Sequence, residues 1–137
     1  MTEQQVKQAK SYGAWDDEDE KRLWGWAELA RELLLDVAER GEVINYKLLW
    51  DTLEAGGQAP TPRGLYRNRT GSLLFRVSHL NKLNEEPLLT ALVVLKETGE
   101  VSEGYEDGAQ VRYGYRPSNI AAHARVERRK IARWVKG

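Results

Sequence analysis

The chain of 137 residues contains no cysteine, one methionine, one phenylalanine and only four prolines. The absence of cysteine excludes disulfides, thiolate metal sites and cysteine nucleophiles, and it fits a reducing compartment. No apolar run is close to the roughly 18 residues that a transmembrane helix needs, so we expect no membrane association. The first residues also lack the apolar stretch of a secretory signal. We therefore expect a cytoplasmic protein.

The motifs of common catalytic and cofactor sites are also missing. The chain contains no G-x-x-x-x-G-K phosphate loop, no G-x-S-x-G nucleophile elbow and no H-E-x-x-H zinc pair. The two histidines, His79 and His123, fall on different predicted helices, and a histidine on a helix is more often packed or exposed than a metal ligand. We predict a protein that is not an enzyme and that holds no metal and no cofactor.

Charge of both signs is abundant and strongly segregated. The 21 Lys/Arg and 21 Asp/Glu residues give a net charge of zero. Residues 1–54 carry a balance of −6 and residues 89–110 carry −4, whereas residues 55–88 carry +3 and residues 111–137 carry +7. A basic tail of this kind either binds phosphate or neutralises the acidic first helix, and the sequence leaves both alternatives open.

Hydrophobic periodicity and capping residues predict four helices in a single domain, residues 1–137, in which residues 1–13 are flexible. The first helix begins near Trp15–Asp17 and ends at Arg40–Gly41, the second is capped by Asn45 and closes at Gly56–Gly57, the third runs from Tyr66 or Thr70 to Leu83, and the last begins after Ser118 or Asn119. A loop with two prolines separates the second helix from the third.

One apolar run predicts the β-structure of the domain. Residues 88–95 are rich in Leu and Val and follow Pro87, which favours a strand buried on both faces. Thr98–Gly99 predicts a tight turn, and Val101 onward predicts a returning strand. The glycines at 104 and 108 are typical of a loop. The fold class that follows is α+β, a small helical domain with a short β-hairpin or small sheet.

The last helix, within residues 118–137, is predicted to be basic and amphipathic. At 100° per residue one side collects the apolar residues Ile120, Ala124, Ile131, Trp134 and Val135. The other side collects Arg125, Arg129, Arg133 and Lys136. A solvated face is the simpler interpretation, but exposed helices usually mix charges of both signs.

The order of these features resembles the C-terminal domain of the DNA alkyltransferases and alkyltransferase-like proteins. The family's helix start, Tyr-Gly-Glu-Leu-Ala, is similar to Asn45-Tyr46-Lys47-Leu48-Leu49. The family's strand with its reactive Pro-Cys-His-Arg-Val is similar to residues 88–94. The turn and Gly-Tyr loop beyond that strand are similar to Thr98-Gly99-Glu100 and Gly104-Tyr105. The resemblance implies a winged-helix-like core over residues 43–108. Ala91 and Leu92 then replace the family's cysteine and histidine, and alkyl transfer needs a thiolate, so no alkyl transfer is expected. The same strand is similar to that of small bacterial and phage proteins with the pattern P-L-L-T-x-L-V-V-x-K-x-T-G.

A second basic segment precedes the third helix. Arg63, Arg67, Asn68 and Arg69 lie in a stretch, residues 55–84, that contains no acidic residue. In a helix-turn-helix layout this segment is the turn before the recognition helix and its first turn, where arginines hold phosphates and Asn68 or Arg69 reaches base edges. An exposed basic linker is the alternative.

Two functions follow from these patterns. The leading hypothesis is a non-enzymatic, winged-helix-like DNA-binding module of phage or mobile-element type. Its docking segment is the one just described, and backbone contacts come from Arg125, Arg128, Arg129, Arg133 and Lys136. The alternative is a protein-interaction module, such as a phage effector that binds a host protein. Five tryptophans favour this alternative, because exposed tryptophan often anchors interfaces.

Overall fold

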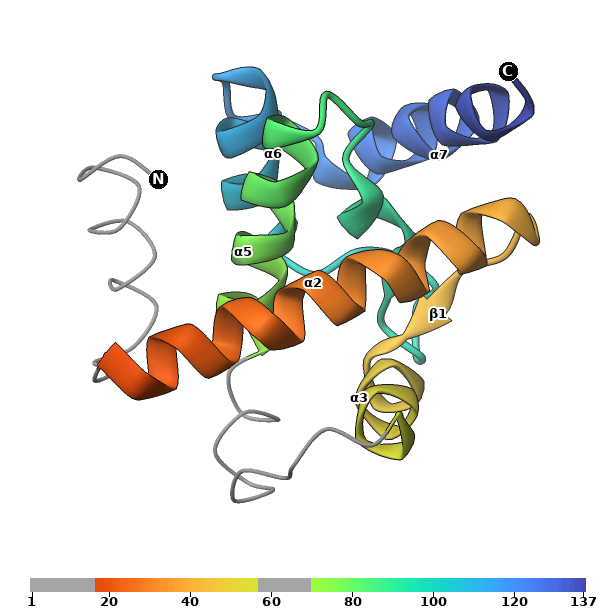
Figure 1. Cartoon of the computed structure of the whole chain (residues 1–137). Helices are drawn as coiled ribbons and strands as arrows, with labels where there is room; N and C mark the ends of the chain where they lie inside the picture. The colour runs from red at the N-terminus through yellow and green to blue at the C-terminus, as the bar shows by residue number, and fades with distance from the viewer. Residues whose placement is uncertain (1–16, 57–69) are drawn as a thin grey trace.

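The computed structural model describes residues 17–56 and 70–137. These residues form five α-helices, one 3₁₀ helix and two very short strands (Figure 1). In chain order they are α2 (Asp17–Glu39), β1 (Ile44–Asn45), α3 (Tyr46–Ala55), α5 (Thr70–Leu83), the 3₁₀ helix η1 (Leu89–Leu92), β2 (Val93–Val94), α6 (Tyr105–Tyr113) and α7 (Ile120–Lys136). The predicted flexible segment, residues 1–13, and the proline-containing loop lie outside the described residues.

The helices with strong local signals form where the sequence predicts them. α2 ends before Gly41, whose φ of 69° is a left-handed conformation that favours glycine. The side chain of Asn45 caps α3 by accepting a hydrogen bond of 2.9 Å from the backbone N–H of Leu48. Asn119 caps α7 in the same way through the N–H of Ala122, at 3.0 Å. The four predicted helices are thus confirmed.

α5 is the central helix of the molecule. It packs against α2, α6 and η1 (Figure 1), and most of its residues are buried, including polar ones such as Arg76 and His79. A helix that is buried on nearly all sides has no polar face left for solvent. A recognition helix needs an exposed surface to enter a groove, and over the body of α5 only Gly71, Lys82 and Leu83 are exposed.

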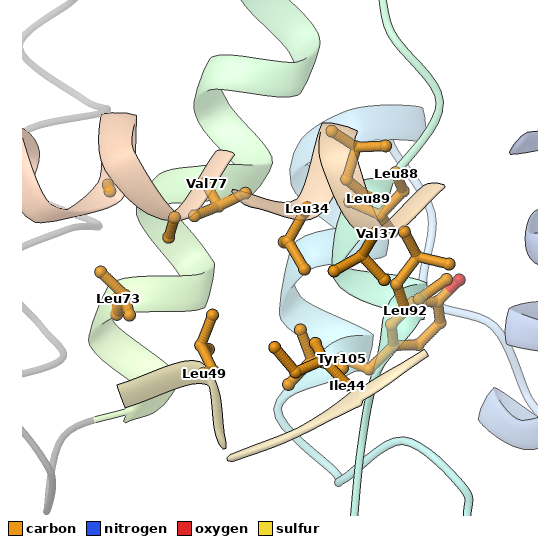
Figure 2. Close-up of a cluster of buried hydrophobic side chains, with 14 of the residues drawn as sticks. Leu34, Val37, Ile44, Leu49, Leu73, Val77, Leu88, Leu89, Leu92 and Tyr105 are labelled. Carbon is orange, nitrogen blue, oxygen red and sulfur yellow. The ribbon is translucent and has the colours of Figure 1, made fainter. Parts of the chain in front are cut away.

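The hydrophobic core lies between α2, α5, η1 and β1. The cluster joins Leu34 and Val37 of α2 with Leu73 and Val77 of α5, and the side chains of η1, β1, α3 and Tyr105 complete it (Figure 2). Leu89, Leu92, Val93 and Val94 are at most 5% exposed, as predicted.

The prediction of a continuous strand over residues 88–95 is wrong. Residues 89–92 form a 3₁₀ helix, and only Val93–Val94 is a strand, which pairs in parallel with Ile44–Asn45. The buried backbone here finds side-chain partners in place of a neighbouring strand. The N–H of Leu88 donates to Glu127, the N–H of Leu89 donates to Asn81, and the carbonyl of Ala91 accepts from Arg128, at 2.7, 3.0 and 2.8 Å. The part of the alkyltransferase comparison that depends on a continuous strand therefore loses its support.

The predicted hairpin is wrong as well, although its turn is confirmed. Gly99 has a φ of 69°, and its N–H donates to the carbonyl of Leu95 at 2.8 Å. Residues 101–104 are irregular and form no strand, and the expected Gly-Tyr-Gly loop is the start of α6, whose Gly108 lies against Ser78 of α5. Gly108 thus provides close helix packing and not a turn.

α7 has the predicted amphipathic character, with one exception. Ala124 and Ile131 are buried, but Trp134, expected in the apolar face, is 40% exposed. It lies almost a full turn beyond Ile131, the last fully buried residue of this helix. Five helices with a two-stranded sheet make a small α+β domain, as predicted.

Candidate nucleic-acid interface

The first predicted docking segment cannot be located in the structure. Arg63, Arg67, Asn68 and Arg69 all lie outside the described residues. The surface that remains to be considered is that of α7, which carries the other five predicted contact residues.

The cations in the first half of α7 bind partners within the protein. Arg125 donates to Glu100 at 2.9 Å, and Arg128 lies 3.7 Å from the other carboxylate oxygen of Glu100. The hydrogen bond from Arg125 lowers the pKa of Glu100 below its ordinary value. Arg128 is only 20% exposed and also donates to the carbonyl of Ala91. The structure therefore gives Arg128 a structural contact to η1, where the sequence predicts a phosphate contact.

The second half of α7 carries three cations besides Lys130, which lies 3.8 Å from Glu127. Arg129, Arg133 and Lys136 are exposed, and no hydrogen bond or ion pair joins their side chains to any residue that the structure describes. The far end of α7 lies beside Ala38 and Glu39, at the C-terminal end of α2. It does not lie along the acidic start of α2, where Glu20 pairs instead with Arg76 of α5. We call Arg129, Arg133 and Lys136 the cationic row.

A cluster of aromatic rings lies next to this row, where α6 passes into α7. His123 contacts two phenol groups: Nδ1 is 2.6 Å from the hydroxyl of Tyr105, and Nε2 is 2.9 Å from the hydroxyl of Tyr115. A neutral imidazole donates from one nitrogen and accepts at the other, so each tyrosine satisfies one nitrogen. Tyr113 and Tyr115 stack with ring centroids 6.3 Å apart and planes 26° from parallel. Gly114, with a φ of 82°, ends α6 between them.

The buried carboxylate of Glu127 fixes the ring of Tyr113. Glu127 is 3% exposed and accepts hydrogen bonds from the hydroxyl of Tyr113 and from the backbone N–H of Leu88. Lys130 donates to the same Tyr113 oxygen at 3.0 Å, and its Nζ lies 4.5 Å from the centre of the tyrosine ring. Burial and the bond to Glu127 raise the pKa of Tyr113, so its phenol stays protonated at neutral pH.

These residues line an open groove of about 430 Å³. Its wall consists of Tyr113, Tyr115, Ala122, His123, Val126, Glu127, Lys130 and Arg133. The groove thus combines aromatic rings with two cations, Lys130 and Arg133. Its one carboxylate, that of Glu127, already accepts hydrogen bonds from Tyr113 and Leu88. Such a surface suits a flat ring that carries negative charge.

This groove was not predicted from the sequence. The glycines at 104 and 108 are typical of a loop, and a histidine on a helix is more often packed or exposed than a metal ligand, so neither pattern indicates such a surface. A usable signal was present, because His123, Glu127 and Lys130 follow at spacings of four and three residues and so share one side of a helix. Nothing in the local pattern, however, placed Tyr113 and Tyr115 against that side.

The other histidine has no such partners. His79 is 3% exposed, and neither ring nitrogen has a hydrogen-bond partner within residues 17–56 and 70–137. Its ring lies against Phe75 and Trp24, with centroids 4.8 and 6.2 Å away. Among the residues that the structure describes, no three His, Asp or Glu side chains form a group suited to a metal ion.

Comparison with protein-family models, curated proteins and solved structures finds no match to this chain. The resemblance to the alkyltransferases stays a prediction from sequence. None of the helices within residues 17–56 and 70–137 is long and apolar enough to span a membrane.

Proposed function

We propose that this protein is a nucleic-acid-binding module that contacts phosphates through the C-terminal half of α7. The observation that carries the proposal is the cationic row, three exposed cations without a partner among the described residues, on a helix whose earlier arginines, Arg125 and Arg128, pair with Glu100. The proposal assigns no catalysis to the chain, and DNA is the first ligand to test.

The spacing of the row supports phosphate contact. Residues 129, 133 and 136 recur at four and three positions, so they lie on one side of α7 over roughly 10 Å of helix. Like charges held in one row repel one another, which costs stability unless an anion binds there. A polyanion gains from such a row because each neutralised phosphate releases condensed counterions.

A salt titration tests the proposal. Fluorescence anisotropy with labelled DNA, duplex and single-stranded, gives the affinity of the intact protein at several salt concentrations. We expect Arg133→Ala to weaken binding to all sequences alike and to reduce the salt slope by roughly one unit. Lys47→Ala is the matched control, because it removes one exposed cation from α3, where Lys47 pairs with Asp51 at 3.3 Å.

Two results would contradict the proposal. One is the absence of binding to either form of DNA at micromolar protein and low salt. The other is an equal loss from Lys47→Ala and Arg133→Ala, since binding would then follow net charge and not the row.

A protein partner is the second candidate, and a specific observation favours it. Trp134 and Val126 of α7 are 40% and 52% exposed, and exposed tryptophan is often an interface anchor. In that case Trp134→Ala would abolish binding to the partner, whereas Arg133→Ala would mainly slow association.

A further inference from the structure

Resting on the proposed function, we propose that the groove between α6 and α7 binds single-stranded nucleic acid. An unpaired base stacks on Tyr115, and Lys130 and Arg133 contact the adjacent phosphates. The cationic row alone would bind single strands and duplexes alike, whereas a stacking ring selects the single strand.

Tyr115 presents an aromatic surface to solvent. Tyr115 is 52% exposed, which places it among the large hydrophobic residues that the described surface leaves open to solvent. The ring is nevertheless held in place, by the 2.9 Å contact with Nε2 of His123 and by stacking on Tyr113. Bases stack on such rings whatever their sequence, because every base has a π-face.

The groove is anchored to the core. His123 is held on its other nitrogen by Tyr105, which is 5% exposed, and Tyr113 is held by the buried Glu127. Glu127 is fixed in turn by the backbone of Leu88, in the buried segment that leads into η1. Rings fixed before a ligand arrives lose little conformational freedom on binding, which favours affinity.

The charge of the groove fits a phosphate-linked base. Lys130 and Arg133 line it, and Arg129 is exposed on the same helix. Its volume of about 430 Å³ falls in the range of small-molecule sites, so it can hold a base with its sugar. A duplex keeps its bases stacked inside, so only an unpaired base can place its face on Tyr115. An acidic peptide would satisfy the cations but has no use for the exposed ring.

The experiment compares a labelled single-stranded oligothymidine with a duplex of equal length, by anisotropy on the full chain. We expect Tyr115→Ala to weaken single-strand binding by roughly 5- to 100-fold with an unchanged salt slope. Duplex binding should change by less than about twofold. Tyr115→Phe keeps the ring and should retain most of the affinity. Arg133→Ala should lower the salt slope for both ligands.

The outcomes separate this inference from the proposed function. Binding to neither ligand would overturn both. Binding to both ligands with no effect of Tyr115→Ala would overturn the stacking site alone and leave phosphate binding by α7 intact. Competition by polyglutamate as effective as that by oligothymidine would also overturn it, because the surface would then recognise anionic charge in general. Thermal melting of Tyr115→Ala at the wild-type temperature shows that its loss of binding is not a loss of fold.

Discussion

His79 of α5 is a buried ionisable ring to which no residue in the described part of the chain is hydrogen-bonded. Burial, together with the positive charges of Lys82 and Arg76, lowers its pKa to about 4. The folded protein therefore keeps His79 neutral where an unfolded chain, with a pKa near 6.5, begins to protonate it. The unfolded state binds more protons in this interval, so stability is complete above about pH 6.5 and falls as the pH drops toward 4.

The substitution His79→Leu should remove this acid sensitivity. In the wild type, we expect the free energy of unfolding to fall by about 2–3 kcal/mol between pH 7 and pH 4 on account of this ring. In His79→Leu that part of the loss should disappear, as measured by urea denaturation at both pH values. Val77→Ala, a buried neighbour that does not titrate, is the control and should destabilise the protein alike at both pH values. An unchanged pH dependence in His79→Leu would show that other groups cause the acid loss.

At the scale of the elements, α5 and α6 approach each other at Gly108. A Cβ built on this glycine would lie 2.4 Å from Oγ and 3.4 Å from Cβ of Ser78. Ser78 has little freedom to move away, because its hydroxyl donates to the carbonyl of Leu74 at 3.0 Å. The glycine therefore weakens the helix locally but permits the close packing of two helices.

We expect Gly108→Ala to destabilise the protein by about 1–3 kcal/mol, although alanine is the better helix former. The double variant Gly108→Ala/Ser78→Ala should recover most of this loss, since it removes the clashing oxygen. Gly104→Ala is the matched control: its nearest neighbour is 3.8 Å away, and its φ of −60° suits alanine. Urea denaturation of the wild type, Gly108→Ala, Ser78→Ala and the double variant gives the coupling energy, and Gly104→Ala is measured in the same way. Additive effects of the substitutions at 78 and 108 would contradict the packing explanation.

At the scale of the molecule, several of the segregated charges that the structure describes are paired between elements distant in sequence. Glu20 of α2 pairs with Arg76 of α5, and Arg31 of α2 binds Glu86, which also accepts a hydrogen bond from Asn81. Glu100 binds the start of α7. The basic tail, for which the sequence left both phosphate and the acidic helix open, thus differs between the two halves of α7. The first half pairs with an acid outside α2, and the second half forms the cationic row.

The pair of Glu20 and Arg76 should dominate the electrostatic contribution to stability, because the Arg76 side chain is fully buried. Glu20→Ala removes a carboxylate that accepts hydrogen bonds from this buried guanidinium, and we expect a loss of about 3–5 kcal/mol. Asp36→Ala is the control: it breaks an exposed pair with Arg40 and should cost less than about 1 kcal/mol. Urea denaturation at pH 7 measures both. Equal effects of the two substitutions would show that burial adds nothing to the first pair.

The sequence by itself determined the helices whose signals are local. Apolar spacing, the caps Asn45 and Asn119, and Gly41 each act within a few residues, so α2, α3, α5 and α7 could be located without a structure. The burial of residues 88–94 could also be predicted from the sequence, because removing so apolar a run from water is strongly favourable.

Only the tertiary structure decided what that run and the glycines after it become. η1 exists because Asn81, Glu127 and Arg128 satisfy its backbone from other helices, and α6 exists because Gly108 fits against Ser78. The aromatic groove likewise needs His123 to meet two tyrosines that precede it in the chain. Local sequence patterns do not indicate such partners, since the contacts form only when distant segments pack together.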